Sequence, residues 1–112
     1  MVTREQVPDA GDIVWLDFDP QAAHEQAGHR PALVLTPARY NAARGMLVCC
    51  PMTTKVRGYV FEVQANTAPA SVVLVDQIKS LDWRARRART RSRAAPEVLA
   101  EVHAKLAALL SI

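Results

Sequence analysis

The sequence predicts a small, mainly β fold, in which an antiparallel sheet curls toward a barrel and one α-helix packs on it. Three observations support this fold class. Short apolar segments follow one another with turns between them, the clearest helical periodicity lies at the C-terminus, and the chain has 112 residues. Strands followed by one helix must bury their apolar faces against each other, and about 100–150 residues is typical of one domain. We therefore expect residues 1–112 to form a single domain.

The first strand is predicted at Asp12–Phe18. Apolar Val14, Leu16 and Phe18 alternate with other residues, and this period of two is that of a β-strand. A polar stretch, Asp19–Arg30, follows it. At about a dozen residues this loop is long for a compact domain, and loops of this length are often functional.

The later strands are short and bounded by Pro, Gly or Asn. We expect them at Pro31–Thr36, Met46–Pro51, Tyr59–Gln64 and Ser71–Val75, the last continuing through Leu81. The connections are predicted to be a turn or a single helical turn at Pro37–Asn41, a polar loop at Thr53–Gly58 and a turn at Asn66–Ala70. The arginine-rich residues 84–93 are expected to hold a short turn and one more strand.

An amphipathic helix is predicted at Pro96–Leu110. Pro96 suits the first helical position, and the negative charge of Glu97 favours a helix start. Apolar residues then recur at helical spacing, at Val98, Val102, Leu106, Leu109 and Leu110.

The cysteines and the apolar segments indicate a cytoplasmic protein. Cys49 and Cys50 are adjacent in a predicted strand, so their side chains point to opposite faces and a disulfide would need an unusual geometry. Two buried thiols are the simpler expectation. The apolar stretches are far shorter than the roughly 20 residues of a membrane span. Residues 1–10 do not resemble a signal peptide.

The positive charge of the chain is concentrated in one block. Six of its fourteen Lys and Arg residues lie in residues 84–93, which contain no acidic residue. Such a block is often a solvated segment. Arginine also binds phosphate through its planar fork, so a polyanion, nucleic acid before acidic protein, is the expected partner.

Motifs for metals and cofactors are missing from the sequence. His24 and His29 are five residues apart and match no zinc-ligand spacing. The four glycines are scattered and form no phosphate-binding loop, and no Gly-x-Ser-x-Gly motif is present. We therefore expect neither a metal ion nor a cofactor.

Two groups of polar residues are the candidates for a site. The first lies in the long loop and the second follows the third predicted strand: Glu25, Gln26, His29 and Arg30, then Thr53, Thr54, Lys55 and Arg57. RNA cleavage without a metal needs a group that takes the proton of the 2′-hydroxyl and donors that stabilise the charge developing on phosphate. Both groups contain such residues.

Several segments resemble the MazF/PemK family of toxin endoribonucleases, most closely its MazF branch. The similar segments run in order over nearly the whole chain: PDAGDIVWLDFD (8–19), EQAGHRPALVL (25–35), PMTT (51–54), GY and FEV (58–59 and 61–63), DQIKS (76–80), WRAR (83–86) and APE (95–97). One departure is the arginine block, which is more basic than is usual in the family at this point.

The resemblance implies an SH3-like antiparallel barrel of the plasmid-maintenance-toxin fold with a C-terminal helix. It also implies a homodimer, cleavage of single-stranded RNA, and neutralisation by an antitoxin whose acidic tail covers the RNA groove. It assigns the catalytic pair to Arg30 and Thr53, with Glu25 implicated in some members. RNA contacts are expected from other positions in these segments and from the basic residues of the Thr53–Gly58 loop: Phe18, Gln26, His29, Thr54, Lys55, Arg57, Gln77, Lys79, Arg84 and Arg86. Phe18 is included because exposed aromatic rings hold unstacked bases.

Two alternative functions have different signatures. A gyrase-poisoning toxin on the same fold, as in the CcdB family, relies on a C-terminal tail with a tryptophan, whereas this chain ends in Leu-Leu-Ser-Ile. A non-catalytic RNA-binding module would not need Arg30 and Thr53 together. A cleavage assay separates these classes.

Overall fold

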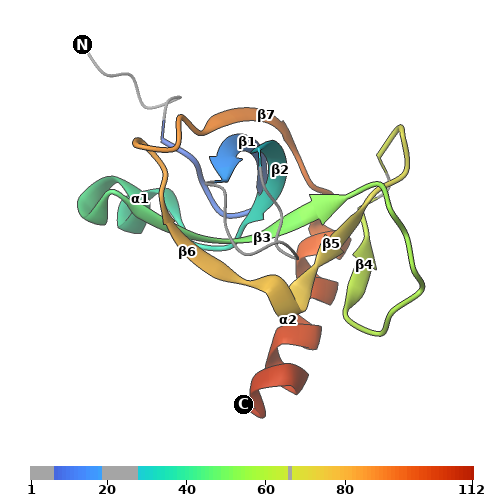
Figure 1. Ribbon diagram of the computed structural model, residues 1–112. Helices are drawn as coiled ribbons and strands as arrows, with labels where there is room; N and C mark the ends of the chain where they lie inside the picture. The colour runs from blue at the N-terminus through green and yellow to red at the C-terminus, as the bar shows by residue number, and fades with distance from the viewer. Residues whose placement is uncertain (1–6, 19–27, 66) are drawn as a thin grey trace.

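The computed structural model describes residues 7–18, 28–65 and 67–112, and Figure 1 draws the arrangement of their elements. Along these residues lie β1 (Asp12–Phe18), β2 (Gly28–Val34), α1 (Ala38–Arg44), β3 (Met46–Thr53), β4 (Glu62–Gln64), β5 (Val72–Leu74), the 3₁₀ turn η2 (Val75–Gln77), β6 (Lys79–Asp82), β7 (Arg89–Arg93) and α2 (Pro96–Leu110). The predicted fold class, an antiparallel β structure with a C-terminal helix, is confirmed.

Strand β3 is the centre of the sheet, whose order is β4-β5-β3-β2-β1-β7. One edge of β3 pairs with β2, and the other edge pairs first with β6 and then with β5. All these pairings are antiparallel. Because β5, η2 and β6 are consecutive, one stretch of chain follows the whole edge of β3 with a turn in its middle. Figure 1 shows the resulting sheet strongly curled, with α2 extending beyond it.

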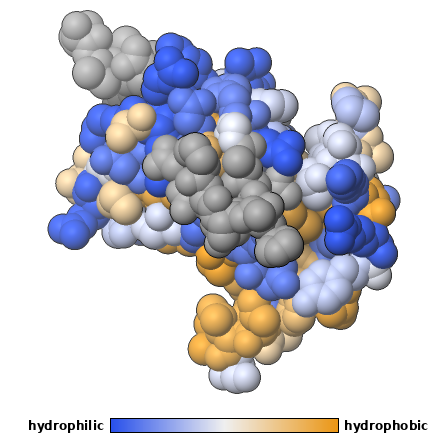
Figure 2. Space-filling view, in the orientation of Figure 1, coloured by the Kyte–Doolittle hydropathy of each residue, from blue (hydrophilic) through white to orange (hydrophobic). Residues whose placement is uncertain are grey.

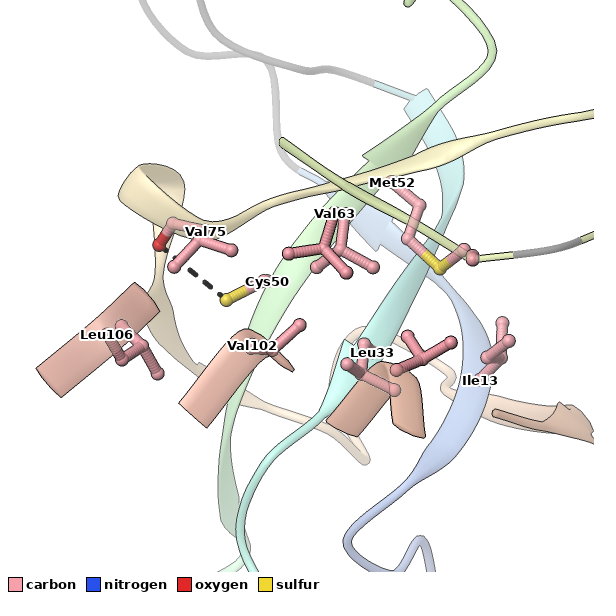
Figure 3. Packing of buried hydrophobic residues seen from close by; sticks show 11 residues of the cluster. Ile13, Leu33, Cys50, Met52, Val63, Val75, Val102 and Leu106 are labelled. Carbon is pink, nitrogen blue, oxygen red and sulfur yellow. Dashed lines mark hydrogen bonds between the residues drawn. The ribbon is translucent and has the colours of Figure 1, made fainter. Parts of the chain in front are cut away.

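The two faces of the sheet bury two separate cores. The first core lies against α2, and Figure 3 shows its packing: Ile13, Leu33, Cys50, Met52, Val63, Ala65, Val73, Val75, Val98, Val102 and Leu106. The second core lies on the opposite face: Val14, Leu16, Phe18, Ala32, Val34, Leu47, Cys49, Leu81 and Trp83. Alternation along each strand assigns adjacent residues to different cores.

Cys49 and Cys50 follow this alternation and are both buried free thiols, as predicted. Each packs in a different core. Burial raises the pKa of each thiol to about 12, because a thiolate would lose its hydration. Cys50 Sγ also donates to the Val75 carbonyl, the contact drawn in Figure 3.

Several boundaries differ from the prediction. Strand β2 begins at Gly28, three residues before the predicted start, because Gly28–Arg30 pair with Phe18–Leu16. His29 and Arg30 therefore lie in a strand and not in the loop. Strand β3 continues past the predicted end at Pro51 to Thr53, since Met52 and Thr53 pair with β5.

Two predicted strands are shorter than expected. The predicted strand Tyr59–Gln64 is reduced to the three residues of β4. The predicted strand from Ser71 through Leu81 is broken by η2, where the Val75 amide donates to the carbonyl of Phe61. The helical turn expected near Pro37 is the seven-residue helix α1. It ends at Gly45, whose φ of +68° is the left-handed conformation that glycine adopts readily.

The C-terminal elements match the prediction. The arginine block forms a turn followed by β7, and α2 spans Pro96–Leu110. Helix α2 buries Val98, Val102 and Leu106 against the first core. Beyond them, Leu109, Leu110 and Ile112 are exposed; Figure 2 shows this apolar end of the molecule. No helix among the described residues is long and apolar enough to cross a membrane.

Candidate nucleic-acid interface and active site

A groove of about 560 Å³ lies where β2 begins and β3 ends. Its lining comes from β1, β2, β3, β7 and the β4–β5 turn: Ile13, Trp15, His29, Arg30, Pro31, Met52, Thr53, Thr54, Thr67, Ala68, Pro69, Ser71 and Ser92. Four of the predicted site residues, His29, Arg30, Thr53 and Thr54, are thus brought to one groove. The antiparallel register explains part of this, because the pairing of Ala32 with Pro51 brings the start of β2 beside the end of β3.

Arg30 carries an unusual polar atom. Its Nε is buried and has no hydrogen-bond partner among the described residues. A buried donor left unpaired costs about 1–3 kcal/mol, so such an atom calls for a physical explanation. An anion in the groove would provide the acceptor that the described residues do not.

His29 is held from β1 and from the arginine block. Its Nδ1 lies 2.8 Å from Asp17 Oδ1, and Arg87 Nε donates to Asp17 Oδ2 at 3.0 Å. The hydrogen bond from His29, and after it the one from Arg87, lowers the pKa of the Asp17 carboxyl. The His29 ring also lies beside Trp15, with ring centroids 5.8 Å apart.

A second hollow, of about 490 Å³, adjoins the groove at Thr53. It is lined by Thr53, Lys55, Arg57, Tyr59, Glu62, Leu74, Asp76 and Gln77. Three more predicted residues, Lys55, Arg57 and Gln77, are therefore assembled here. Two basic side chains face two carboxylates in this hollow, so its charge is mixed. A hydrogen bond to the Asp76 carboxylate raises the pKa of the Tyr59 hydroxyl.

Glu62 organises the loop that carries Lys55 and Arg57. Its Oε1 accepts from the backbone amides of Arg57 and Gly58 at 3.1 and 2.9 Å, and the Tyr59 amide donates to it at 3.4 Å. From α2, Lys105 Nζ donates to the carbonyls of Val60 and Glu62. The loop is therefore tied both to a strand and to a helix, which pre-orders its basic residues.

One sequence-based expectation is wrong. Phe18 was expected to be an exposed ring, but it is only 4% exposed. It packs in the second core because it lies on the same face of β1 as Val14 and Leu16. Lys79 Nζ lies 5.4 Å from its ring centroid, so Lys79 covers Phe18 at the surface. Phe18 is not available for base stacking.

The other predicted residues lie around these hollows. Arg84 stacks on Trp83, with Arg84 Cζ 4.2 Å from the ring centroid. Arg86 donates from a terminal nitrogen to the Asp17 carbonyl at 3.3 Å, and its own carbonyl accepts from the Asp17 amide at 2.8 Å. Arg86 thus clamps the end of β1. Glu25 and Gln26 lie outside the described residues.

Sequence reasoning missed Asp17 and Ser92. Asp17 alternates with the buried residues of β1, and this period of two could have assigned it to the opposite face. Ser92 has no comparable signal, since its place in the groove depends on the pairing of β7 with β1. Within the described ranges, no group of three or more His, Cys, Asp or Glu residues is arranged to hold a metal ion.

The sequence and the fold both match known proteins. Residues 9–110 match the family described as PemK-like, MazF-like toxin of type II toxin-antitoxin system. The chain is 50% identical over 111 residues to the endoribonuclease toxin MazF of Escherichia coli, covering 98% of this chain and 99% of that protein. It is 36% identical to the endoribonuclease toxin ChpB of Escherichia coli, covering 89% and 91%.

Two solved structures also superpose on this fold. The fold superposes on MazF from Deinococcus radiodurans with a TM-score of 0.88 at 53% identity, covering 95% of this chain and 98% of that one. It superposes on a chain of a MazE-MazF crystal structure from the same organism with a TM-score of 0.85 at 50% identity, again covering 95% and 98%.

Proposed function

The chain belongs to the family of PemK-like, MazF-like toxins of type II toxin-antitoxin systems, and on that premise we propose that Arg30 and Thr53 form the centre at which it cuts RNA. It is an endoribonuclease toxin. Its substrate is single-stranded RNA, and the lining of its groove includes the start of β2, the end of β3 and the β4–β5 turn.

The proposed reaction uses a nucleophile from the substrate. The 2′-oxygen attacks the adjacent phosphorus, the bond to the 5′-oxygen breaks, and the products carry a 2′,3′-cyclic phosphate and a 5′-hydroxyl. The guanidinium of Arg30 stabilises the charge that develops on the phosphate, and the hydroxyl of Thr53 donates a further hydrogen bond to it. No metal ion is needed, because the step requires only proton transfer and charge stabilisation.

The observation that carries this proposal is the unpaired Nε of Arg30. This atom is buried and has no acceptor among the described residues, and Arg30 lines the groove together with Thr53. A phosphate oxygen would satisfy this donor, and charge-assisted hydrogen bonds of this kind are roughly twice as strong as neutral ones. The acceptor of the 2′-proton is either the Glu25 carboxylate or the His29 imidazole.

RNA on either side of the cut is proposed to follow the second hollow and the turn at the start of the arginine block. Near the groove, the RNA is contacted by Thr54, Lys55, Arg57 and Gln77. Gln26 is added to this set because of the family resemblance. Lys79 and Arg84 contact it from the surface, where each lies over an aromatic ring. Arg86 is assigned an indirect part, since it holds the end of β1.

The partners are part of the same proposal. An antitoxin with an acidic tail covers the groove, as the family and the existence of MazE-MazF complexes suggest. The chain acts as a homodimer, and the exposed apolar end of α2 supports this, since contiguous exposed apolar surface often marks an interaction site. Its place of action is the cytoplasm, where mRNA is translated.

The test is cleavage by purified protein with EDTA present. A single-stranded RNA should be cut with 5′-hydroxyl and cyclic-phosphate ends, and the positions should be mapped by sequencing 5′ ends. A strand with 2′-deoxyribose at the cut site should bind and resist cleavage. Activity that EDTA abolishes and magnesium restores, or cleavage of the 2′-deoxy strand, would refute the proposed chemistry while leaving the family assignment intact.

A further inference from the structure

Asp17 connects His29 in the groove with Arg87 in the arginine block, and we propose that this connection makes His29 Nε2 the acceptor of the 2′-hydroxyl proton. The inference rests on the proposed function and deepens it. In this scheme His29 contacts the reacting atoms, and Asp17 and Arg87 are positioning residues.

The hydrogen bond to Asp17 selects the tautomer of His29. A carboxylate can only accept hydrogen bonds, so the 2.8 Å contact between His29 Nδ1 and Asp17 Oδ1 places the proton on Nδ1. The neutral ring then has its lone pair on Nε2, which has no partner among the described residues. An imidazole oriented in this way by a carboxylate is the arrangement that serves as a general base in hydrolytic enzymes.

Arg87 fixes the carboxylate that fixes His29. The two oxygens of Asp17 have separate donors, since Oδ1 binds His29 and Oδ2 binds Arg87. The backbone of Asp17 is held as well, because its amide donates to the Arg86 carbonyl at 2.8 Å. Asp17 is therefore constrained at both ends, which removes the rotational freedom that would let His29 turn away.

The backbone conformation of Arg87 indicates that its side chain has a specific role at this position. Its φ is +56°, in the left-handed region that glycine adopts most readily. The side chain is 75% exposed, so packing does not explain an arginine at this position. Its described contact is the ion pair with Asp17. We infer that Arg87 occupies a backbone position suited to glycine because it positions Asp17.

Each proton transferred in this reaction has a donor and an acceptor. His29 Nε2 takes the proton from the 2′-oxygen as the bond from that oxygen to phosphorus forms and the bond to the 5′-oxygen breaks. The leaving 5′-oxygen takes a proton from water, and the imidazolium later returns its proton to solvent. Asp17 stabilises the imidazolium, Arg30 binds the phosphate, and Arg87 balances the charge of Asp17.

The test compares single-turnover rates at saturating enzyme with affinities for an uncleavable 2′-deoxy strand. His29→Gln should lower the rate by about 10²–10⁴, the usual contribution of a positioned proton acceptor, with affinity within about threefold. Asp17→Asn should lower it by about 10² or more, because an amide can donate to Nδ1 and select the wrong tautomer. Free imidazole should partly restore His29→Ala but not Arg30→Ala.

Arg87→Gly separates positioning from a structural role. Glycine relieves the positive φ, so the melting temperature should stay level or rise, while the rate falls about tenfold, because a small misplacement of a reacting group is costly. If Arg87 had only a structural role, Arg87→Gly would lower the melting temperature and the rate together. Arg39→Ala, which removes an exposed arginine from α1, is the charge-matched control and should change neither.

Two outcomes overturn the inference. His29→Gln that cuts at the wild-type rate would exclude His29 as proton acceptor, and Arg87→Gly at the wild-type rate would exclude the connection through Asp17. If Arg30→Ala is inactive in the same assay, the proposed function stands and the inference alone fails. If wild-type protein cuts no RNA at all, the proposed function itself has failed.

Discussion

Arg30 and Thr53 reach one groove from adjoining strand ends, and the buried Nε of Arg30 has no acceptor among the described residues. This relationship predicts the effect of truncating either residue. Arg30→Ala and Thr53→Ala should each lower kcat by about 10²–10³, the usual loss when a donor aimed at transition-state charge is removed. Single-turnover cleavage of a fluorescent RNA measures it.

Arg30→Ala and Thr53→Ala should lower the activity without lowering the thermal stability. Neither residue belongs to the two cores, and Arg30→Ala removes a buried donor that is unpaired in the free protein. Both variants should keep the wild-type melting temperature within a few degrees, measured by circular dichroism. Arg30→Lys should remain nearly as slow as Arg30→Ala, since a lysine lacks the planar fork. Near-normal cutting by Arg30→Ala would remove the central assignment.

Asp17 predicts a pH-dependent stability. The pKa of its carboxyl is lowered from 3.8 by the hydrogen bonds of His29 and Arg87. A lowered pKa means that the charged form is stabilised in the folded state, so the contribution is complete above about pH 4 and is lost as the pH falls through the folded-state value. The stability gap between wild type and Asp17→Asn should therefore be full at neutral pH and close below pH 4.

Urea unfolding at several pH values between neutral and acidic measures this gap. Glu101→Gln is the matched control, because Glu101 is exposed and its pair with Lys105 is long, at 3.8 Å. The control should show a small gap at every pH. A gap for Asp17→Asn that stays constant down to the lowest pH would contradict the assigned hydrogen bonds.

Local patterns predicted most of the fold. The alternation along Asp12–Phe18 and the helical spacing after Pro96 gave the bounds that β1 and α2 have in the structure. The break at Val75–Gln77 could not be predicted in this way. Its turn depends on a long-range contact, since the Val75 amide donates to the carbonyl of Phe61.

The site was predictable where the residues are close to a strand end and not where it depends on long-range contacts. Arg30 and Thr53 came from the family-like motifs and lie in one groove. Phe18 was misassigned because its type was weighed above its position on the buried face of β1. The pair of Asp17 and Arg87 joins residues 70 positions apart, which no local pattern indicates.

Glu62 predicts a separation of binding from chemistry. Its carboxylate accepts the amides of Arg57, Gly58 and Tyr59, so Glu62→Ala should release the loop that carries Lys55 and Arg57. Hydrogen bonds to charged groups contribute about 1.5–3 kcal/mol, but this loop is exposed, and we expect the low end. KM should rise several-fold with kcat changed less than twofold, measured by steady-state cleavage. A loss confined to kcat would contradict the loop's assignment to binding.

The arginine block predicts the salt dependence of RNA binding. Strand β7 is exposed along its length and borders the groove through Ser92, and Figure 2 shows hydrophilic residues over this end of the molecule. The basic side chains of the block are not equivalent. Arg93 is paired with Asp12 at 2.8 Å, whereas Arg89 and Arg91 make no ion pair within the described residues.

If Arg89 and Arg91 bind phosphates, the affinity for an uncleavable RNA should fall with log salt at a slope of about −0.7 per phosphate neutralised. Arg89→Ala with Arg91→Ala should flatten this slope and weaken all RNA sequences about equally, since phosphate contacts carry no sequence information. Arg93→Ala should change it less, because Asp12 already offsets its charge, and Arg39→Ala is the control. Fluorescence anisotropy measures each slope. An unchanged slope in the double variant would mean that the block is a solvated segment, and a loss confined to an acidic antitoxin peptide would assign it to that partner.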